Sequence, residues 1–145
     1  MDKICACFPP VTSKSIFHHY LPGVGAISHA AFAVHVISPN LLHRLSPEND
    51  LLIGNAVFLS ANAGVALYIY HRAHMRKVSG TARVIYSIYG SLMFNFGSAL
   101  FWALTKLVLP GNTVVRSSFA ILTSVTLISV AREYLGYIDT VLPDD

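Results

Sequence analysis

Long apolar runs alternate with short polar segments along the chain and predict four membrane-spanning helices. The runs cover residues 21–42, 51–70, 84–109 and 117–138. Each reaches the roughly 20 residues that an α-helix needs to cross the hydrocarbon core of a bilayer. The second run carries no charged residue, and Pro110 and Gly111 follow the third as a helix stop. We therefore expect an all-α integral membrane bundle with short loops.

The segments that flank the four runs are short. Residues 1–20 contain Pro9, Pro10 and Lys14 and predict a loop or an interfacial segment on the cytoplasmic side. Residues 139–145 predict an acidic tail, so the transmembrane domain spans residues 21–138. The first run is the weakest prediction of the four, because it holds two histidines and is interrupted at Pro39. Because polar groups inside a bilayer are costly without partners, this helix must pack against protein, tilt or lie partly in the interface.

Composition agrees with a membrane environment. Charged residues make up 12% of the chain and hydrophobic residues 54%, whereas a soluble domain has about 25% charged residues. The net charge of +3 comes from scattered Lys and Arg residues. Because they form no basic stripe with interleaved aromatic residues, we expect the lipid bilayer and no nucleic acid as a partner.

The distribution of basic residues predicts the orientation. Four spans place the N-terminus, the 71–80 segment and the C-terminus on one side of the membrane. That side carries Lys3, Lys14, Arg72, Arg76, Lys77 and Arg83, against Arg44, Lys106 and Arg116 on the other. The positive-inside rule therefore predicts that both termini are cytoplasmic. Residues 1–10 resemble neither a signal peptide nor a mitochondrial presequence, which favours the endoplasmic reticulum or downstream membranes, with the mitochondrial inner membrane as the alternative.

Among the polar side chains inside the predicted spans, five are candidates for intramembrane contacts: His29, His35, Asn55, Asn62 and Asn95. Their simplest use is hydrogen bonding between helices, which is worth about 0.6–2 kcal/mol per bond in a membrane. The alternative is a polar lining for a small ligand or an ion path. Small residues at Ala56, Ser60 and Gly64, and at Gly90 and Gly97, predict close packing of the second and third spans as a hairpin.

Seven histidines raise the question of a metal or a haem. His18, His19, His71 and His74 flank the first two spans, which antiparallel packing would bring to one membrane face. They form either an imidazole cluster for a transition metal or a set of interfacial side chains. His29 and His35 point about 120° apart on one helix and cannot grip one haem, so we expect no cofactor.

Two further features concern the ends of the chain. Cys5 and Cys7 fit the loose pattern of S-palmitoylation near a membrane helix, with unmodified thiols as the alternative. Arg132 and Glu133 are adjacent and therefore project about 100° apart on a helix, so they do not pair with each other.

The sequence contains no convincing nucleophile–base set and no phosphate-binding glycine loop. We therefore expect a small non-enzymatic accessory, assembly or scaffolding subunit, bound to a membrane protein partner or to further copies of itself. The alternative is a small carrier or channel-forming oligomer with a polar intramembrane lining. A redox protein built on the cytoplasmic-side histidines is a third hypothesis.

Overall fold

The computed structural model describes residues 12–45 and 47–142, which form helices joined by short turns. These residues include four helical segments long and apolar enough to cross a membrane, namely Ile16–Ile37, Asp50–Tyr70, Gly80–Thr105 and Thr113–Val141. No strand occurs in the described part of the chain. The prediction of an all-α fold with four such helices is confirmed.

The first helical segment begins earlier than residue 21. It runs without a break through α2 (Ser13–Ser15), the π-helical turn η1 (Ile16–Tyr20) and α3 (Leu21–Ile37). Thr12 starts it with a reciprocal cap, because its side chain accepts from the Ser15 amide while the Ser15 hydroxyl oxygen accepts from the Thr12 amide. Residues 13–20 are therefore helical, whereas residues 1–11 lie outside the described part.

The first segment also ends earlier than residue 42. Ser38 leaves the helical conformation and separates α3 from the short helix α4 (Pro39–Leu45). The cause is Pro39, because a proline disfavours the helical conformation in the residue before it.

The other three long helices are α5 (Asp50–Tyr70), α6 (Gly80–Thr105) and α7 (Thr113–Val141), with the 3₁₀ turn η2 (Ala73–Lys77) between α5 and α6. α6 begins before the start of the predicted 84–109 span and also ends before the end of that span. Its first turn includes Arg83, whose guanidinium lies 3.9 Å from the ring centre of Tyr70 and donates to the Tyr70 carbonyl. The charged residue is therefore held at the end of α5 and does not exclude a helix.

α7 exceeds the predicted 117–138 span at both ends. The Asn112 side chain caps its first turn by accepting from the Val114 and Val115 amides. At the other end, Asp139 lies inside the helix and pairs with residues of the α5–α6 connection. The predicted acidic tail is thus helical as far as Val141.

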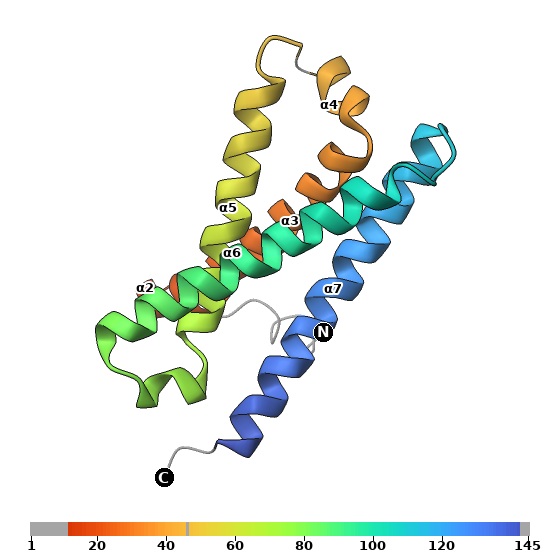
Figure 1. The fold of residues 1–145 in the computed structure, drawn as a ribbon. Coiled ribbons are helices and arrows are strands. Elements are labelled where there is room, and N and C mark those ends of the chain that lie inside the picture. The colour runs from red at the N-terminus through yellow and green to blue at the C-terminus, as the bar shows by residue number, and fades with distance from the viewer. Residues whose placement is uncertain (1–11, 46, 143–145) are drawn as a thin grey trace, which may run out of the picture.

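α3 occupies the centre of the molecule and packs against α5, α6 and α7 (Figure 1). α6 and α7 follow each other in the chain but diverge from their connecting turn, and they contact each other little. The span that carries His29 and His35 is therefore the one most surrounded by protein, in agreement with the first of the three arrangements expected for it.

The closest helix contact joins α3 to α5. A Cβ atom added at Gly25 would lie 2.5 Å from the Gly64 Cα, and one added at Gly64 would lie 2.4 Å from the Gly25 Cα. The two backbones can approach so closely because neither residue has a side chain. α5 also packs against α6, but its main partner is α3, so the expected α5–α6 hairpin is not the tightest pair.

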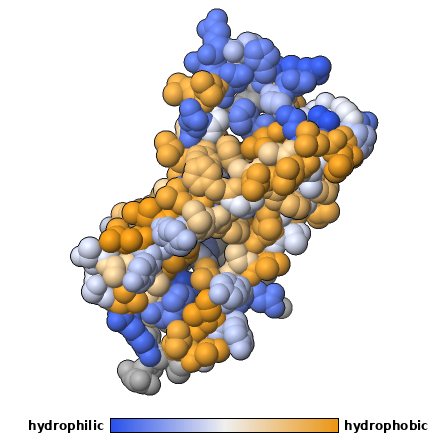
Figure 2. All heavy atoms as spheres, viewed as in Figure 1, coloured by the Kyte–Doolittle hydropathy of each residue, from blue (hydrophilic) through white to orange (hydrophobic). Residues whose placement is uncertain are grey.

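The outer surface of the bundle is largely apolar. On the face in Figure 2, hydrophobic residues cover the middle of the molecule and hydrophilic residues gather toward its ends. Exposed large hydrophobic residues occur on all four long helices, for example Ile27, Leu52, Leu100 and Leu122. This distribution is typical of a protein whose outer surface faces lipid.

Candidate functional site

The interior of the bundle is unusually polar. The buried polar residues among those described are His29, Ser38, Ser87, Ser91, Asn95, Ser98 and Ser124. The buried hydrophobic ones are Ala33, Ile37, Ala61, Met75, Trp102 and Ala120, of which three are alanines. Small and polar side chains thus make up most of the fully buried interior, and such residues are typical of helix interfaces in membranes.

One face of α6 supplies much of this polar interior. Ser87, Ser91, Asn95, Ser98 and Trp102 follow one another at intervals of three or four residues, which places them on one helix face. The Ser91 hydroxyl donates to the Asn62 carbonyl of α5 at 2.6 Å. The Trp102 indole donates to the Thr123 hydroxyl of α7 at 3.2 Å. This face therefore ties α6 to both α5 and α7.

His29 lies at the centre of the interior and is completely buried. Its Nδ1 is 2.7 Å from the Ser124 Oγ of α7. The imidazole stacks on Phe94, with ring centres 5.0 Å apart, and meets Trp102 edge-on at 4.8 Å. Its Nε2 has no hydrogen-bond partner among the described residues. His29 thus joins α3 to α6 and α7, and its Nε2 could bind a further polar group.

The three predicted asparagines lie in different surroundings. Asn95 is buried, and its amide donates to the Ser91 carbonyl at 2.9 Å, while its Oδ1 has no partner in the described part. Asn62 is half-buried and donates to the Phe58 carbonyl of its own helix at 2.9 Å. Asn55 is exposed on the outer face of α5. The structure therefore does not gather the three amides into one lining.

His35 and some of the small residues lie in helix contacts, whereas the other small residues are exposed. The His35 ring fits against Gly54, where an added Cβ would lie 2.7 Å from Nε2. Gly64 packs on α3, and an added Cβ at Gly90 would lie 3.1 Å from the Ile69 side chain of α5. The remaining small residues predicted to pack are exposed, namely Ala56, Ser60 and Gly97. A Cβ atom added at Gly97 would have nothing within 4 Å. Only part of each predicted stripe lies in a helix contact.

The four histidines of the metal hypothesis do not converge on one point. The rings of His18 and His71 lie 3.9 Å apart, but the His74 Nδ1 is 2.5 Å from an oxygen of Asp139. Within the described residues no group of three or more metal-binding side chains could hold an ion. The described residues therefore give the metal cluster no support, and the interfacial alternative for these histidines stays open. Cys5 and Cys7 lie outside the described residues.

Two of these histidines have structural roles at the end of the bundle. Asp139 of α7 accepts from the His74 amide at 3.0 Å and pairs with the Arg72 guanidinium at 2.7 Å. This network fastens α7 to η2. The His71 Nδ1 lies 2.8 Å from the Leu67 carbonyl. Burial lowers the pKa of His71 below its usual value of 6.5, and nearby His18 acts in the same direction.

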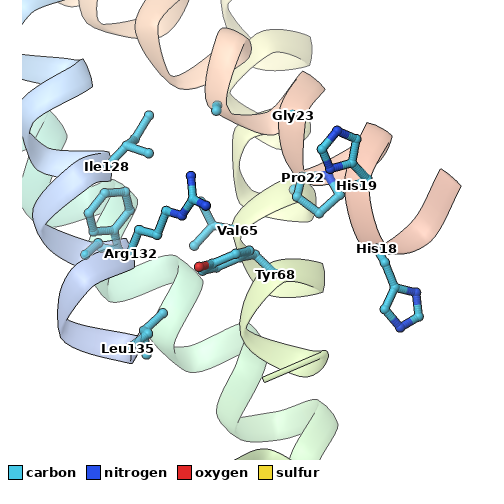
Figure 3. Close-up of a pocket in the computed structure, with 13 residues that line it drawn as sticks. His18, His19, Pro22, Gly23, Val65, Tyr68, Ile128, Arg132 and Leu135 are labelled. Atoms are coloured by element: carbon cyan, nitrogen blue, oxygen red, sulfur yellow. The ribbon is translucent and has the colours of Figure 1, made fainter. Parts of the chain in front are cut away.

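A cavity of about 290 Å³ lies at this end of the bundle, between α7 and the pair α3 and α5. Its walls are mainly apolar, and its polar lining comes from four side chains, His18, His19, Tyr68 and Arg132. In Figure 3 the Arg132 side chain reaches from α7 into the space beside Val65 and Tyr68. Phe94 also lines the cavity and stacks on His29, so the cavity extends toward the buried polar interior. We call it the Arg132 cavity.

Arg132 and Glu133 project in different directions, as expected from their adjacent positions. Both side chains are exposed, but Arg132 lines the cavity and Glu133 does not. Neither side chain forms a salt bridge or a hydrogen bond with another described residue. Arg132 is thus a solvent- or lipid-accessible cation beside a mostly apolar cavity, with no ionic partner in the described part of the chain.

Several of these residues were not among those predicted. Ser87, Ser91 and Ser98 share the helical spacing of Asn95, and this pattern is visible in the sequence. Ser124 and Asp139 have no comparable signal, because their importance comes from contacts with residues more than sixty positions away. Comparison with protein-family models, curated proteins and solved structures gives no match.

Proposed function

We propose that this chain is a multi-pass integral membrane protein and acts as a non-enzymatic accessory, assembly or scaffolding subunit of a membrane complex. Its four long apolar helices and apolar outer surface support residence in a bilayer. We further propose that both termini are cytoplasmic and that the membrane is the endoplasmic reticulum or one downstream of it. The mitochondrial inner membrane is the alternative.

The observation that carries the subunit proposal is the outer face of α5, formed by Asn55, Ala56 and Ser60. All three are exposed, and neither polar side chain has a hydrogen-bond partner in the described part of the chain. In hydrocarbon an unpaired polar group is costly because no water is present to satisfy it. A second helix on this face would supply partners, and the small residues would allow it to come close.

The polar interior supports a structural role. The bonds His29–Ser124, Ser91–Asn62 and Trp102–Thr123 each join two different helices. Their most direct use is therefore to hold the bundle together. We propose that the partner is another membrane protein or a second copy of this chain.

Site-specific photo-crosslinking in native membranes tests the proposal. A photo-reactive residue at Asn55 should give a protein adduct of defined mass, and that mass distinguishes a second copy from another protein. The control is Leu100 of α6, which is 61% exposed and should give lipid adducts. Equal labelling at both positions, together with a strictly monomeric mass in mild detergent, would contradict the subunit proposal.

A second candidate function is that of a small carrier or channel-forming oligomer. Three of the buried atoms without partners among the described residues, His29 Nε2, His35 Nδ1 and Asn95 Oδ1, favour it because a passing solute or ion could use them. Ion or solute flux into liposomes, lost in Asn95→Leu and in Asn62→Leu, would support this function. Liposomes that remain tight with the wild-type protein would oppose it.

A further inference from the structure

We propose that the Arg132 cavity binds one anionic phospholipid of the surrounding bilayer, with the phosphate at the Arg132 guanidinium and an acyl chain along the apolar walls. This inference rests on the proposed membrane residence but not on the proposed role as a subunit.

The first step of the argument is the charge of the cavity. Arg132 is its only lining residue with a permanent charge, and it has no ionic partner among the described residues. The neighbouring Arg72 donates to the Tyr68 hydroxyl at 3.0 Å, but its charge is balanced by Asp139. A guanidinium binds phosphate oxygens through two parallel hydrogen bonds, which makes a phosphate a fitting counter-ion here.

The second step is the shape and lining of the cavity. Pro22, Ala26, Val65, Ile128 and Leu135 give it aliphatic walls. Its volume of about 290 Å³ has room for a lipid headgroup together with part of one acyl chain. A free inorganic anion would leave these apolar walls unused, whereas a phospholipid uses both the cation and the walls.

The third step is the position of the cavity. His18 and His19 at one rim precede α3, and Arg132 lies near the end of α7 that pairs with η2. The same end carries the basic residues Arg72, Arg76 and Lys77. Basic pockets between helices on the cytoplasmic side of a membrane are typical sites for anionic headgroups. In the proposed orientation, this placement gives the cavity access to the cytoplasmic leaflet, in which such lipids are most abundant.

Native mass spectrometry of the full chain in mild detergent tests the site. Added phosphatidylglycerol should remain bound through detergent removal, while phosphatidylcholine and inorganic phosphate should be lost. Arg132→Gln should weaken phosphatidylglycerol binding at least tenfold, Arg132→Lys less, and the neighbouring Glu133→Gln not at all. Equal retention of phosphatidylcholine, or unchanged binding in Arg132→Gln, would overturn the proposal. Tighter retention of palmitate than of phosphatidylglycerol would overturn the assignment to a phospholipid.

A second pair of variants tests the cavity without altering its charge. Gly23 lines the cavity, and an added Cβ there would meet nothing within 4 Å, so Gly23→Leu should fold and fill the space. Gly97→Leu is the matched control, because Gly97 has equal room but lies outside the cavity. Loss of lipid in Gly23→Leu alone supports the site, and equal binding in both variants contradicts it. Carbonate extraction separates the hypotheses, because release of the protein from membranes would overturn membrane residence itself.

Discussion

At the scale of single residues, His29 shows how a polar side chain becomes part of a membrane bundle. Its ring has the buried position usual for a large apolar residue, between Phe94 and Trp102, while Nδ1 binds Ser124. The ring therefore contributes packing as well as a hydrogen bond. The two contributions can be separated by substitution.

His29→Ala should destabilise the protein more than Ser124→Ala. The first variant leaves a cavity between two aromatic rings, at a cost of about 2–5 kcal/mol. The second removes only a hydrogen bond, worth about 0.6–2 kcal/mol in a membrane. Denaturant unfolding in detergent micelles measures both, with Ser129→Ala as the control because Ser129 is exposed on the same helix. An effect of Ser124→Ala as large as that of His29→Ala would show that packing of the ring contributes little.

His71 predicts a dependence of stability on pH. Its pKa in the folded protein lies below 6.5 because burial lowers it. The hydrogen bond to the Leu67 carbonyl raises the pKa, but burial together with smaller contributions from His18 and nearby arginines outweighs this effect. The unfolded chain therefore takes up a proton first as pH falls. This contribution to stability is complete above pH 6.5 and is lost as pH falls from 6.5 to the folded pKa.

Unfolding measurements across that pH range should show the loss, and His71→Gln should reduce it. NMR titration of the imidazole measures the folded pKa directly, and His18→Gln should raise it. A folded His71 pKa above 6.5 would contradict the burial argument.

At the scale of the helices, hydropathy and proline positions were sufficient to predict the number and order of the long helices. They did not predict which helices pack most closely. The close approach of Gly25 to Gly64 is a match between distant residues, and a pattern of small residues along one helix cannot show its partner. For the same reason Gly97 looked like a packing residue but is exposed. The observed helix ends differ from the predicted ones where a contact with a distant residue holds a charged side chain, as at Arg83 and Asp139.

Gly64→Ala should separate α3 from α5. The new methyl group would lie 2.4 Å from the Gly25 Cα and 3.0 Å from the Leu21 carbonyl oxygen, so the backbones must move. Overpacking of this kind typically costs about 1–3 kcal/mol. Gly97→Ala is the control, because its methyl group would meet nothing within 4 Å. Thermal unfolding in detergent should show a lower midpoint for Gly64→Ala only, and equal midpoints would argue against the close contact.

At the scale of the whole molecule, the arrangement joins a polar interior to an apolar exterior. The sequence predicted five polar positions for the interior, but the structure buries His29 and Asn95, half-buries His35 and Asn62, and exposes Asn55. A helical wheel shows which residues share a face but not which way that face turns. The Arg132 cavity is lined by residues of all four long helices, and sequence pattern alone gives no sign of it.

The distribution of charge over the two ends of the molecule makes a prediction about its orientation. α6 has 26 residues and spans about 39 Å at about 1.5 Å per residue, which exceeds the roughly 30 Å hydrocarbon core. Ser79 and Gly111 flank this helix and are exposed, so they should lie on opposite sides of the membrane. With Cys5 and Cys7 replaced by serine, Ser79→Cys should react with an impermeant maleimide in sealed microsomes, and Gly111→Cys should react only after detergent is added. The opposite pattern would invert the topology and place the Arg132 cavity in the other leaflet. Reaction at both positions would show that α6 does not cross the bilayer.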